Sequence, residues 1–327
     1  MDSCLPSRML IYPIQGRVIC TGRMSRSLHK ILRRGLPQGW KPILIALEAR
    51  RHILLREEWR SFIKEGNKGM NYHEIIAAVG EGSAHPGGYQ GTVDFIRFAG
   101  ITPGLRVLEV GCGTGRTACL LTQLGAHVTA MDHSVVMLEK AERRAQLQQL
   151  QIEWIQGDIT AIPLRSDTYD AVIAESVTVF AADPVKAFRE YHRVLRKDGQ
   201  VWDRELFRTL PHPALEREMR ELYGNPHLPD AAAWMRMMQE AGFRNVRQWE
   251  PGAAAEEGVS PNASKDTNPR QGGASSFDWQ NAWDPHRILD LEALQDPAVR
   301  TFFKENEAFL QRYRAHLDYG VFMAEKR

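Results

Sequence analysis

The fold is decided by the stretch Val107-Leu108-Glu109-Val110-Gly111-Cys112-Gly113-Thr114-Gly115-Arg116. It predicts an apolar strand that runs into a glycine-rich turn, and the turn opens a helix. Glycines permit the backbone conformations of a tight turn and let a ligand approach the main chain closely. The free N–H groups at a helix N-terminus suit a carboxylate or a phosphate. The stretch therefore predicts a ligand-binding turn between a strand and a helix.

Apolar runs alternate with helical patterns on both sides of this turn. The expected strands are 106–110, 127–131, 152–156, 169–175, 200–206, 244–250 and 319–324, and the expected helices are 72–79, 92–99, 117–124, 134–150, 183–195, 230–241 and 297–316. Strands that alternate with helices of this length indicate βαβ units and a parallel sheet. The continuous apolar run Ala171-Val172-Ile173-Ala174 is typical of a strand covered on both faces. The sequence thus predicts a doubly wound α/β sheet with helices on both faces.

The two ends of the chain depart from this pattern. Residues 1–69 hold 14 Lys and Arg against 5 Asp and Glu, whereas the remaining residues hold 28 against 35. A basic extension on an acidic body is a candidate anchor for nucleic acid or a membrane surface. The alternative is that translation starts at Met70 and that 1–69 is not part of the native protein. Residues 251–276 are rich in Gly, Ala, Ser, Asn and Pro, and 251–318 form an expected insertion before the last strand.

Composition excludes several classes of protein. Hydrophobic residues make up 43% and charged residues 25% of the 327 residues, which is typical of a globular protein. No apolar run approaches the roughly 20 residues that span a bilayer, and we find no secretory signal. The four cysteines form no Cys-x-x-Cys pair, so neither a disulfide framework nor a metal site is expected. These features predict a cytoplasmic protein without membrane partners, and they leave its oligomeric state open.

A dinucleotide-binding enzyme is the first alternative for the glycine turn. Its fingerprint is Gly-x-Gly-x-x-Gly, in which the third glycine allows close packing of helix and strand. Here the glycines are Gly111, Gly113 and Gly115, and position 116 is arginine. Glu109, inside the preceding strand, is also unexplained by dinucleotide binding. The dinucleotide fingerprint does not match.

The stretch Val-Leu-Glu-Val-Gly-Cys-Gly-Thr-Gly resembles the first motif of class I S-adenosylmethionine-dependent methyltransferases, especially those that act on small molecules. The resemblance covers about residues 87–246 and, weakly, the terminal strand. It implies a seven-stranded, mostly parallel sheet of the Rossmann-like methyltransferase type, with the last strand antiparallel. It also implies that the acidic residue and the turn surround the methionine part of S-adenosylmethionine. The residues concerned are Glu109, Gly111, Cys112, Gly113 and Gly115.

Two further turns are candidates for the nucleoside part of the cofactor. Asp132 ends the second strand, 21 residues after Gly111, where an acid is placed to accept both hydroxyls of a ribose; its alternative role is an ordinary helix cap. His133 is expected in the same pocket. The resemblance implies that Asp158 accepts a hydrogen bond from the adenine amino group while Ile159 packs on the ring. The alternative for Asp158 is a turn residue.

Candidates for catalysis lie at the carboxyl ends of the fourth and fifth strands. Glu175 is expected to face the cofactor or substrate, because ligands of open α/β sheets lie beyond these strand ends. Glu205 is expected near the substrate mouth, where it would deprotonate a nucleophile or, alternatively, join a surface ion pair. His85, in a glycine-rich loop before the first strand, is a candidate general base because imidazole titrates near neutrality. A solvated loop histidine is its alternative.

The sequence predicts methyl transfer from S-adenosylmethionine to a small-molecule acceptor. The fourth strand ends in Glu175-Ser-Val-Thr178 rather than the Asn-Pro-Pro-Tyr or Asp-Pro-Pro-Tyr of enzymes that methylate base amines, and this disfavours a nucleic-acid acceptor. It also holds no cysteine to serve as the nucleophile of carbon-5 pyrimidine methylation. Two alternatives stay open: an RNA or protein methyltransferase anchored by the basic extension, and a non-catalytic S-adenosylmethionine-binding protein.

Overall fold

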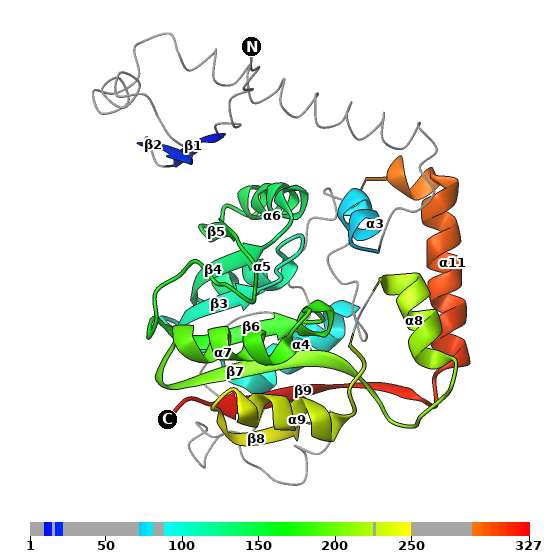
Figure 1. Ribbon diagram of the computed structural model, residues 1–327. Coiled ribbons are helices and arrows are strands. Elements are labelled where there is room, and N and C mark those ends of the chain that lie inside the picture. The colour runs from blue at the N-terminus through cyan, green and yellow to red at the C-terminus, as the bar shows by residue number, and fades with distance from the viewer. Residues whose placement is uncertain (1–9, 15–16, 22–71, 81–87, 225–226, 250–289) are drawn as a thin grey trace, which may run out of the picture. The chain divides into compact units, whose positions relative to one another are not determined.

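The computed structural model describes residues 10–14, 17–21, 72–80, 88–224, 227–249 and 290–327 (Figure 1). The chain divides into two units, residues 1–69 and 70–327. In the first unit, β1 (Leu10–Ile14) pairs antiparallel with β2 (Arg17–Thr21), a hairpin that the sequence did not predict. The loop residue His85 and the low-complexity stretch 251–276 lie outside the described residues.

The second unit is built on a seven-stranded sheet with the order β5-β4-β3-β6-β7-β9-β8. Its strands are β3 (Arg106–Val110), β4 (His127–Asp132), β5 (Glu153–Gln156), β6 (Tyr169–Glu175), β7 (Leu195–Arg208), β8 (Arg244–Trp249) and β9 (Leu317–Glu325). Strands β3 to β7 are mutually parallel, and β9 runs antiparallel between β7 and β8. This arrangement confirms the mostly parallel sheet with an antiparallel last strand.

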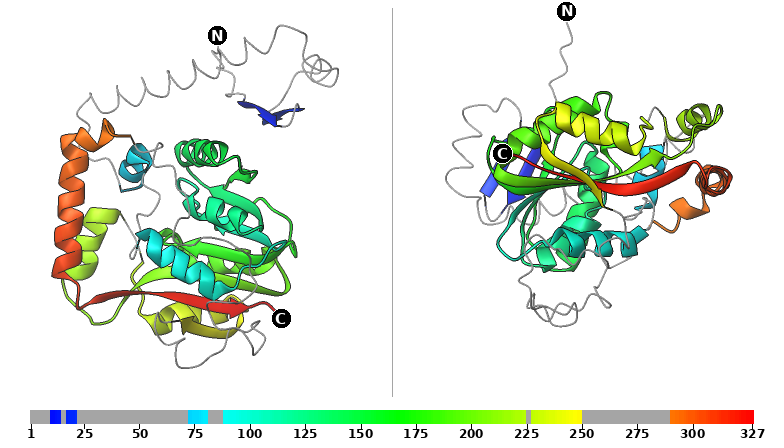
Figure 2. Two further views of the ribbon diagram at one scale, coloured as in Figure 1. Left: turned by 180° about the vertical axis from the view of Figure 1, so that it is seen from behind. Right: turned by 90° about the horizontal axis from the view of Figure 1, so that it is seen from below.

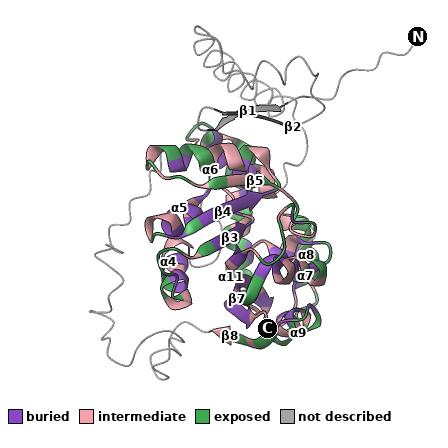
Figure 3. Cartoon of the chain, turned by 90° about the vertical axis from the view of Figure 1, so that its left-hand side faces the viewer, coloured by how far each residue is buried: buried purple, intermediate pink, exposed green. Residues whose placement is uncertain are grey.

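Helices cover both faces of this sheet, as Figure 2 shows edge-on. One face carries α4 (Gly88–Ala99), α5 (Arg116–Gln123) and α6 (Val135–Leu147), and the other carries α7 (Pro184–Val194) and α9 (Ala231–Glu240). Successive residues of a strand point to opposite faces, so Val107 packs with Phe95 under α4 while Leu108 packs with Phe188 under α7. All four side chains are fully enclosed. Figure 3, coloured by burial, shows that most of β4 is buried as well. The continuous apolar strands therefore reflect burial on both faces.

Local signals fix most helix ends. Ser134 accepts a hydrogen bond from the N–H of Met137 and begins α6, and Asp183 followed by Pro184 begins α7 in the same way. α6 ends at Leu147 instead of residue 150, because Gln149 takes a left-handed backbone with φ 57°. α4 begins at Gly88, four residues before its predicted start at Thr92.

Three helices stand together beyond the sheet, and we call them the cap: α3 (Tyr72–Val79), α8 (Leu215–Tyr223) and α11 (Pro297–Arg312). α8 and α11 share a cluster of buried side chains that includes Met219 and Phe309. Among the aromatic contacts of α3, Tyr72 lies 5.3 Å from Tyr223 and 5.8 Å from Phe302, measured between ring centroids. The sequence predicted α3 and α11 but not α8.

Among the described residues, no helix combines the length and the apolar character needed to cross a bilayer. The same residues hold no group of three or more His, Cys, Asp or Glu side chains placed to bind a metal ion. Cys112 and Cys119 are buried free thiols.

Candidate functional site

The glycine turn after β3 places its three glycines in left-handed conformations, with φ of 64° at Gly111, 51° at Gly113 and 76° at Gly115. A Cβ at Gly111 would lie 2.3 Å from Val177 Cγ2, and one at Gly115 would lie 2.7 Å from Ala141 Cβ. A Cβ at Gly113 would meet nothing within 4 Å. The outer two glycines thus permit close packing, whereas the middle one leaves its backbone facing open space where a ligand has room.

Glu109 reaches into this turn from the end of β3. Its side chain is buried, and Oε2 has no hydrogen-bond partner in the described part of the chain. Burial, followed by the neighbouring carboxylates of Glu175 and Asp132, raises the pKa of Glu109 well above its ordinary value. A buried polar atom without a partner is costly. Glu109 is therefore poised to gain from a cationic donor such as an amine.

Asp132 ties the glycine turn to the next turn along the sheet. Its Oδ2 accepts a hydrogen bond from the N–H of Gly113, and its Oδ1 accepts one from the N–H of Ser134, both at 2.8 Å. The helix cap of α6 is Ser134 itself, so Asp132 is not the ordinary cap. His133 Nδ1 lies 3.4 Å from Asp132 Oδ1, although most of the His133 side chain is exposed. The carboxylate is held rigidly beside the open backbone of Gly113.

The turn after β5 brings Asp158 next to this group, because the N–H of Gly157 donates to the carbonyl oxygen of Asp132 at 3.0 Å. Asp158 Oδ1 accepts bonds from the Thr160 N–H at 2.7 Å and from its hydroxyl at 2.9 Å. These bonds lower the pKa of Asp158 and keep it ionised. Asp158 thus acts as a turn residue, as its alternative role predicted, and both of these turn hydrogen bonds end on Oδ1. Ile159 packs at the edge of the core.

Glu175 ends β6 in a buried polar network. Oε1 accepts a hydrogen bond from Thr117, Oε2 accepts one from Thr92, and Arg204 Nη1 lies 3.2 Å from Oε2. The guanidinium of Arg204 also stacks over Tyr319 at 5.1 Å from the ring centroid. Both carboxylate oxygens are therefore engaged in joining α4, α5 and β7. A part for Glu175 in catalysis stays a prediction.

The sequence predicted Glu205 near the substrate mouth, but the structure places it in the interior. Its side chain is fully buried, and Oε1 accepts hydrogen bonds from the N–H groups of Val177 and Thr178. Asp203, two residues earlier on the same face of β7, is equally buried and accepts a bond from the Thr178 hydroxyl. Alternation along a strand placed both carboxyl groups under α7 rather than at the mouth.

The two buried acids act as a pair. Asp203 Oδ2 and Glu205 Oε2 have no donor among the described residues, and burial raises the pKa of Glu205 to about 7 and that of Asp203 well above its ordinary range. A single proton held between the two carboxyl groups satisfies both oxygens. The pair thereby anchors η1 (Thr178–Phe180), the short helix that follows β6.

Sequence reasoning missed the contacts of Tyr72 and His73 on α3 with Phe180 and His133, a group of rings that we call the aromatic roof. The Tyr72 ring stacks on Phe180 with 5.6 Å between centroids, and the His73 ring lies 4.5 Å from Phe180 and 5.9 Å from His133. The helical pattern of α3 was readable, but its docking partner Phe180 lies more than a hundred residues away in sequence. No local signal reports such a contact.

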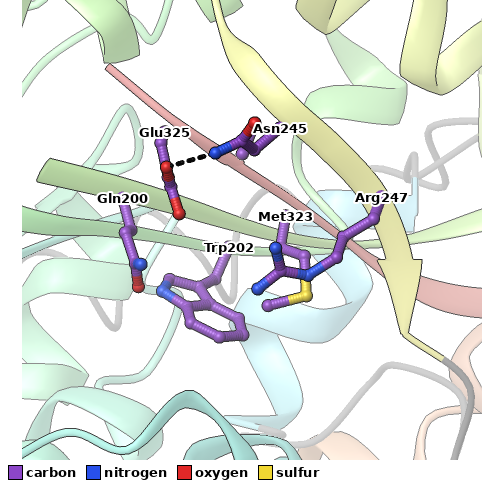
Figure 4. Close-up of a pocket in the computed structure, with 7 residues that line it drawn as sticks. Gln200, Trp202, Asn245, Arg247, Met323 and Glu325 are labelled. Carbon is purple, nitrogen blue, oxygen red and sulfur yellow. Dashed lines mark hydrogen bonds between the residues drawn. The ribbon is translucent and has the colours of Figure 1, made fainter. Parts of the chain in front are cut away.

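Figure 4 shows a shallow pocket elsewhere on the sheet, lined by Gln200, Trp202, Asn245, Arg247, Met323, Ala324 and Glu325. Asn245 donates to Glu325 across it at 2.7 Å. Gln200 pairs with Ala171 in the first half of β6, whereas Arg204 pairs with Glu175 at its end. This pocket therefore lies away from the glycine turn and is not part of the candidate site.

Comparisons with known proteins find similarity to methyltransferases. A family model described as a methyltransferase domain matches residues 108–202. The chain is 26% identical over 256 residues to the uncharacterized methyltransferase YodH of Bacillus subtilis, covering 78% of this chain and 99% of that protein. It is 27% identical to phosphoethanolamine N-methyltransferase 1 of Arabidopsis thaliana, covering 54% of this chain and 36% of that protein.

Among solved structures, the fold resembles phosphoethanolamine N-methyltransferase 2 of Haemonchus contortus in complex with phosphomonomethylethanolamine and S-adenosylhomocysteine. The TM-score is 0.54 at 18% identity, and the match covers 77% of this chain and 57% of the other. At this identity the likeness concerns the fold alone.

Proposed function

Since the chain belongs to the class I S-adenosylmethionine-dependent methyltransferases, we propose that it moves the methyl group of that cofactor to a small-molecule acceptor. The observation that carries the placement of the cofactor is the buried Glu109 Oε2, which has no partner in the described part of the chain, beside the open backbone of Gly113. A buried carboxylate oxygen without a partner on β3 and an uncovered backbone in the turn that follows β3 fit a ligand that brings an amine.

The residues present fit S-adenosylmethionine part by part. Glu109 would accept from the amino group of its methionine part, and the backbone around Gly113 would face the same part. Asp132 would accept from the ribose hydroxyls, because each of its oxygens retains a lone pair beyond the backbone bonds it makes. Asp158 and Ile159 would hold the adenine by one hydrogen bond and apolar contact. Cys112, Gly111, Gly115 and His133 complete the pocket through backbone shape and packing.

When bound, the cofactor supplies an activated methyl group on a sulfonium, whose leaving thioether needs no acid. The protein therefore has mainly to align the acceptor, and positioning of this kind contributes roughly 7–11 kcal/mol of barrier lowering. Here the aligning elements are rigid: the turn is locked by Asp132, and the end of β6 is locked by Glu175 and by the Asp203–Glu205 pair. Because the leaving group needs no acid and the protein mainly aligns the acceptor, a site for methyl transfer needs no catalytic dyad.

A small acceptor is supported by what lies around the site. The names of similar proteins include phosphoethanolamine N-methyltransferases and a sterol 24-C-methyltransferase, both acting on small molecules. In the described residues, α3 brings Tyr72 and His73 against Phe180 of η1, the short helix that follows β6. Such a roof suits a compact acceptor better than a polymer.

The cofactor assignment is tested by calorimetry with S-adenosylhomocysteine. Asp132→Asn keeps the shape of the side chain but removes its charge and half its acceptor capacity, so we expect a loss of about 1–3 kcal/mol in binding free energy. Asp167→Asn is the matched control, because Asp167 is an exposed acid just before β6, at the amino-terminal ends of the parallel strands, where it pairs with Lys326. Equal affinity of Asp132→Asn and wild type would remove the ribose assignment.

The transfer itself is tested with S-adenosylmethionine carrying a labelled methyl group. The enzyme is incubated with a small-molecule extract, with total RNA and with a protein lysate in parallel. We expect label in the small-molecule fraction. Label confined to RNA or protein would contradict the proposed acceptor class, and cofactor binding without transfer to any fraction would favour a non-catalytic binding protein.

A further inference from the structure

Helix α3 is fastened across the carboxyl ends of the strands. Lys140 of α6 donates a hydrogen bond from Nζ to the carbonyl oxygen of Ala78 at 2.7 Å, and Ile76 and Ala77 pack against Met137, near the start of α6. Figures 1 and 2 both show α3 between α6 and α11. These contacts hold the second half of α3 against α6, and the first turn of α3 contacts Phe180 and His133.

His73 occupies the central position of this turn. Its ring lies edge-on to Phe180, which follows β6, and edge-on to His133, which follows β4. In the sheet, β3 runs between β4 and β6. The His73 ring therefore lies between residues that follow the two strands flanking β3, close enough to Asp132 for its charge to act on the ring. The glycine turn with Gly113, which follows β3, is at this same end of the sheet.

The chemistry of His73 suits a ligand contact. The ring forms no hydrogen bond with another residue in the part of the chain that the structure describes. Burial and the nearby His133 lower its pKa, against the opposing influence of Asp132 and of Glu74 on its own helix. The ring is therefore neutral at pH 7 and offers one donor and one acceptor nitrogen. A half-buried imidazole with both nitrogens unused beside Asp132 is placed to bind a hydroxyl.

We propose that His73 is a further cofactor-binding residue, which closes the S-adenosylmethionine site from the side of α3 and hydrogen-bonds a ribose hydroxyl opposite Asp132. This inference rests on the proposed function, because it needs the nucleoside to lie where Asp132 and His133 place it. It adds a contact from outside the stretch that the methyltransferase family model matches, which begins at residue 108. α3 thus becomes part of the binding site rather than a packing accessory.

The test measures two ligands on the full chain by calorimetry at pH 7.5: S-adenosylhomocysteine, and 5′-methylthioadenosine, which has the ribose but lacks the amino-acid part. His73→Phe keeps an aromatic ring against Phe180 and removes both nitrogens, and His73→Ala removes the ring as well. We expect His73→Phe to weaken both ligands by about 2- to 10-fold, the loss of one hydrogen bond. His73→Ala should weaken them at least as much.

The matched controls are His127→Phe and His127→Ala, because His127 is exposed at the start of β4, the strand whose other end carries Asp132. They should bind both ligands as wild type does. Wild-type affinity in His73→Phe would overturn the inference while leaving the cofactor site intact. A loss seen only with S-adenosylhomocysteine would place the contact on the amino-acid part and overturn the ribose assignment. Failure of the wild type itself to bind either ligand would defeat the proposed function first.

Discussion

At the scale of single residues, the proposed contact between Glu109 and the cofactor would link binding to pH. Its pKa is raised in the free protein, so the carboxyl group is protonated below that value, whereas contact with an ammonium group favours the ionised form. Binding should therefore release a proton, and affinity should rise with pH until Glu109 is already ionised in the free protein. In the free protein the raised pKa of Glu109 has the opposite effect on stability to a lowered one, because it favours the folded state at low pH and not at high pH.

This linkage predicts a measurable proton release. Calorimetry of S-adenosylhomocysteine binding in buffers of different ionisation enthalpy should detect up to about one proton leaving the protein per ligand bound. Glu109→Gln, which cannot ionise, should show less release and a flatter dependence of affinity on pH. Equal proton release in wild type and Glu109→Gln would show that another group is responsible.

A second residue-scale prediction concerns Glu205. Its pKa is about 7 in the folded protein and about 4.3 in an unfolded chain, so the folded state binds more protons between these values. Stability is therefore greatest below the unfolded pKa and falls as the pH rises through 7. Glu205→Gln keeps a carbonyl for the backbone N–H groups and offers a donor to Asp203. Because the variant has no carboxyl group at position 205 to ionise, we expect its stability relative to wild type to rise by about 1–3 kcal/mol between pH 5 and pH 8.

Urea unfolding at pH 5 and pH 8 checks this expectation. The advantage of Glu205→Gln over wild type should be larger at pH 8 than at pH 5. Glu240→Gln, at an exposed acid on the end of α9, is the control and should follow wild type at both values. An advantage independent of pH would mean that the substitution acts through packing and not through the shared proton.

The sequence revealed some of these residues and hid others. Asp132 was readable because a fixed place in a βαβ unit gives it its neighbours. The partners of Glu175 were not readable, because Thr92 and Arg204 meet it only through helix docking and strand register. The burial of Glu205 follows from the face of β7 on which it lies. Alternation along the strand shows that Asp203 and Glu205 share a face, but it does not show which face is enclosed.

At the scale of elements, the Glu175–Arg204 pair joins β6 to β7 beneath α4. Both side chains are nearly enclosed, so removing Glu175 takes a buried carboxylate partner away from the Arg204 guanidinium. Glu175→Leu should therefore cost about 3–5 kcal/mol of unfolding free energy. Glu175→Leu combined with Arg204→Met replaces the pair by apolar side chains and should recover a substantial part of that loss. Chemical denaturation of the wild type, both single variants and the double variant measures the coupling, and strictly additive losses would contradict it.

Helices and strands whose ends are marked by nearby residues were predictable from the sequence. Elements whose place depends on contacts with distant segments were not. Asp183-Pro184 announces α7 with its own cap, and strand 169–175 was recovered with its observed ends. α8 was missed although Leu215 and Met219 share one of its faces, because a nine-residue helix after a long strand leaves few turns of pattern. The grouping of α3, α8 and α11 into the cap depends on contacts between segments far apart in sequence, and a short window of sequence cannot predict such contacts.

At the scale of the whole molecule, the alternation of strands and helices determined the architecture, because parallel strands need crossover helices and the crossovers must cover both faces. The antiparallel place of β9 came from family resemblance alone. The chain divides at residue 69/70. The predicted basic extension and the hypothesis that translation starts at Met70 both stay proposals.

The sheet, the cap and the proposed cofactor contacts all belong to residues 70–327, so a variant beginning at Met70 should bind S-adenosylhomocysteine within about 2-fold of the full chain, a difference below roughly 0.5 kcal/mol. A variant beginning at Gly80 lacks α3 and with it the buried residues Ile75, Ile76 and Val79. Each such side chain contributes about 1.5–3 kcal/mol by burial, so this shorter variant should melt at a lower temperature and bind the ligand more weakly. Thermal melting and calorimetry on the three proteins separate the two effects. Weak binding by the Met70 variant with unchanged melting would instead give the basic extension a part in the site.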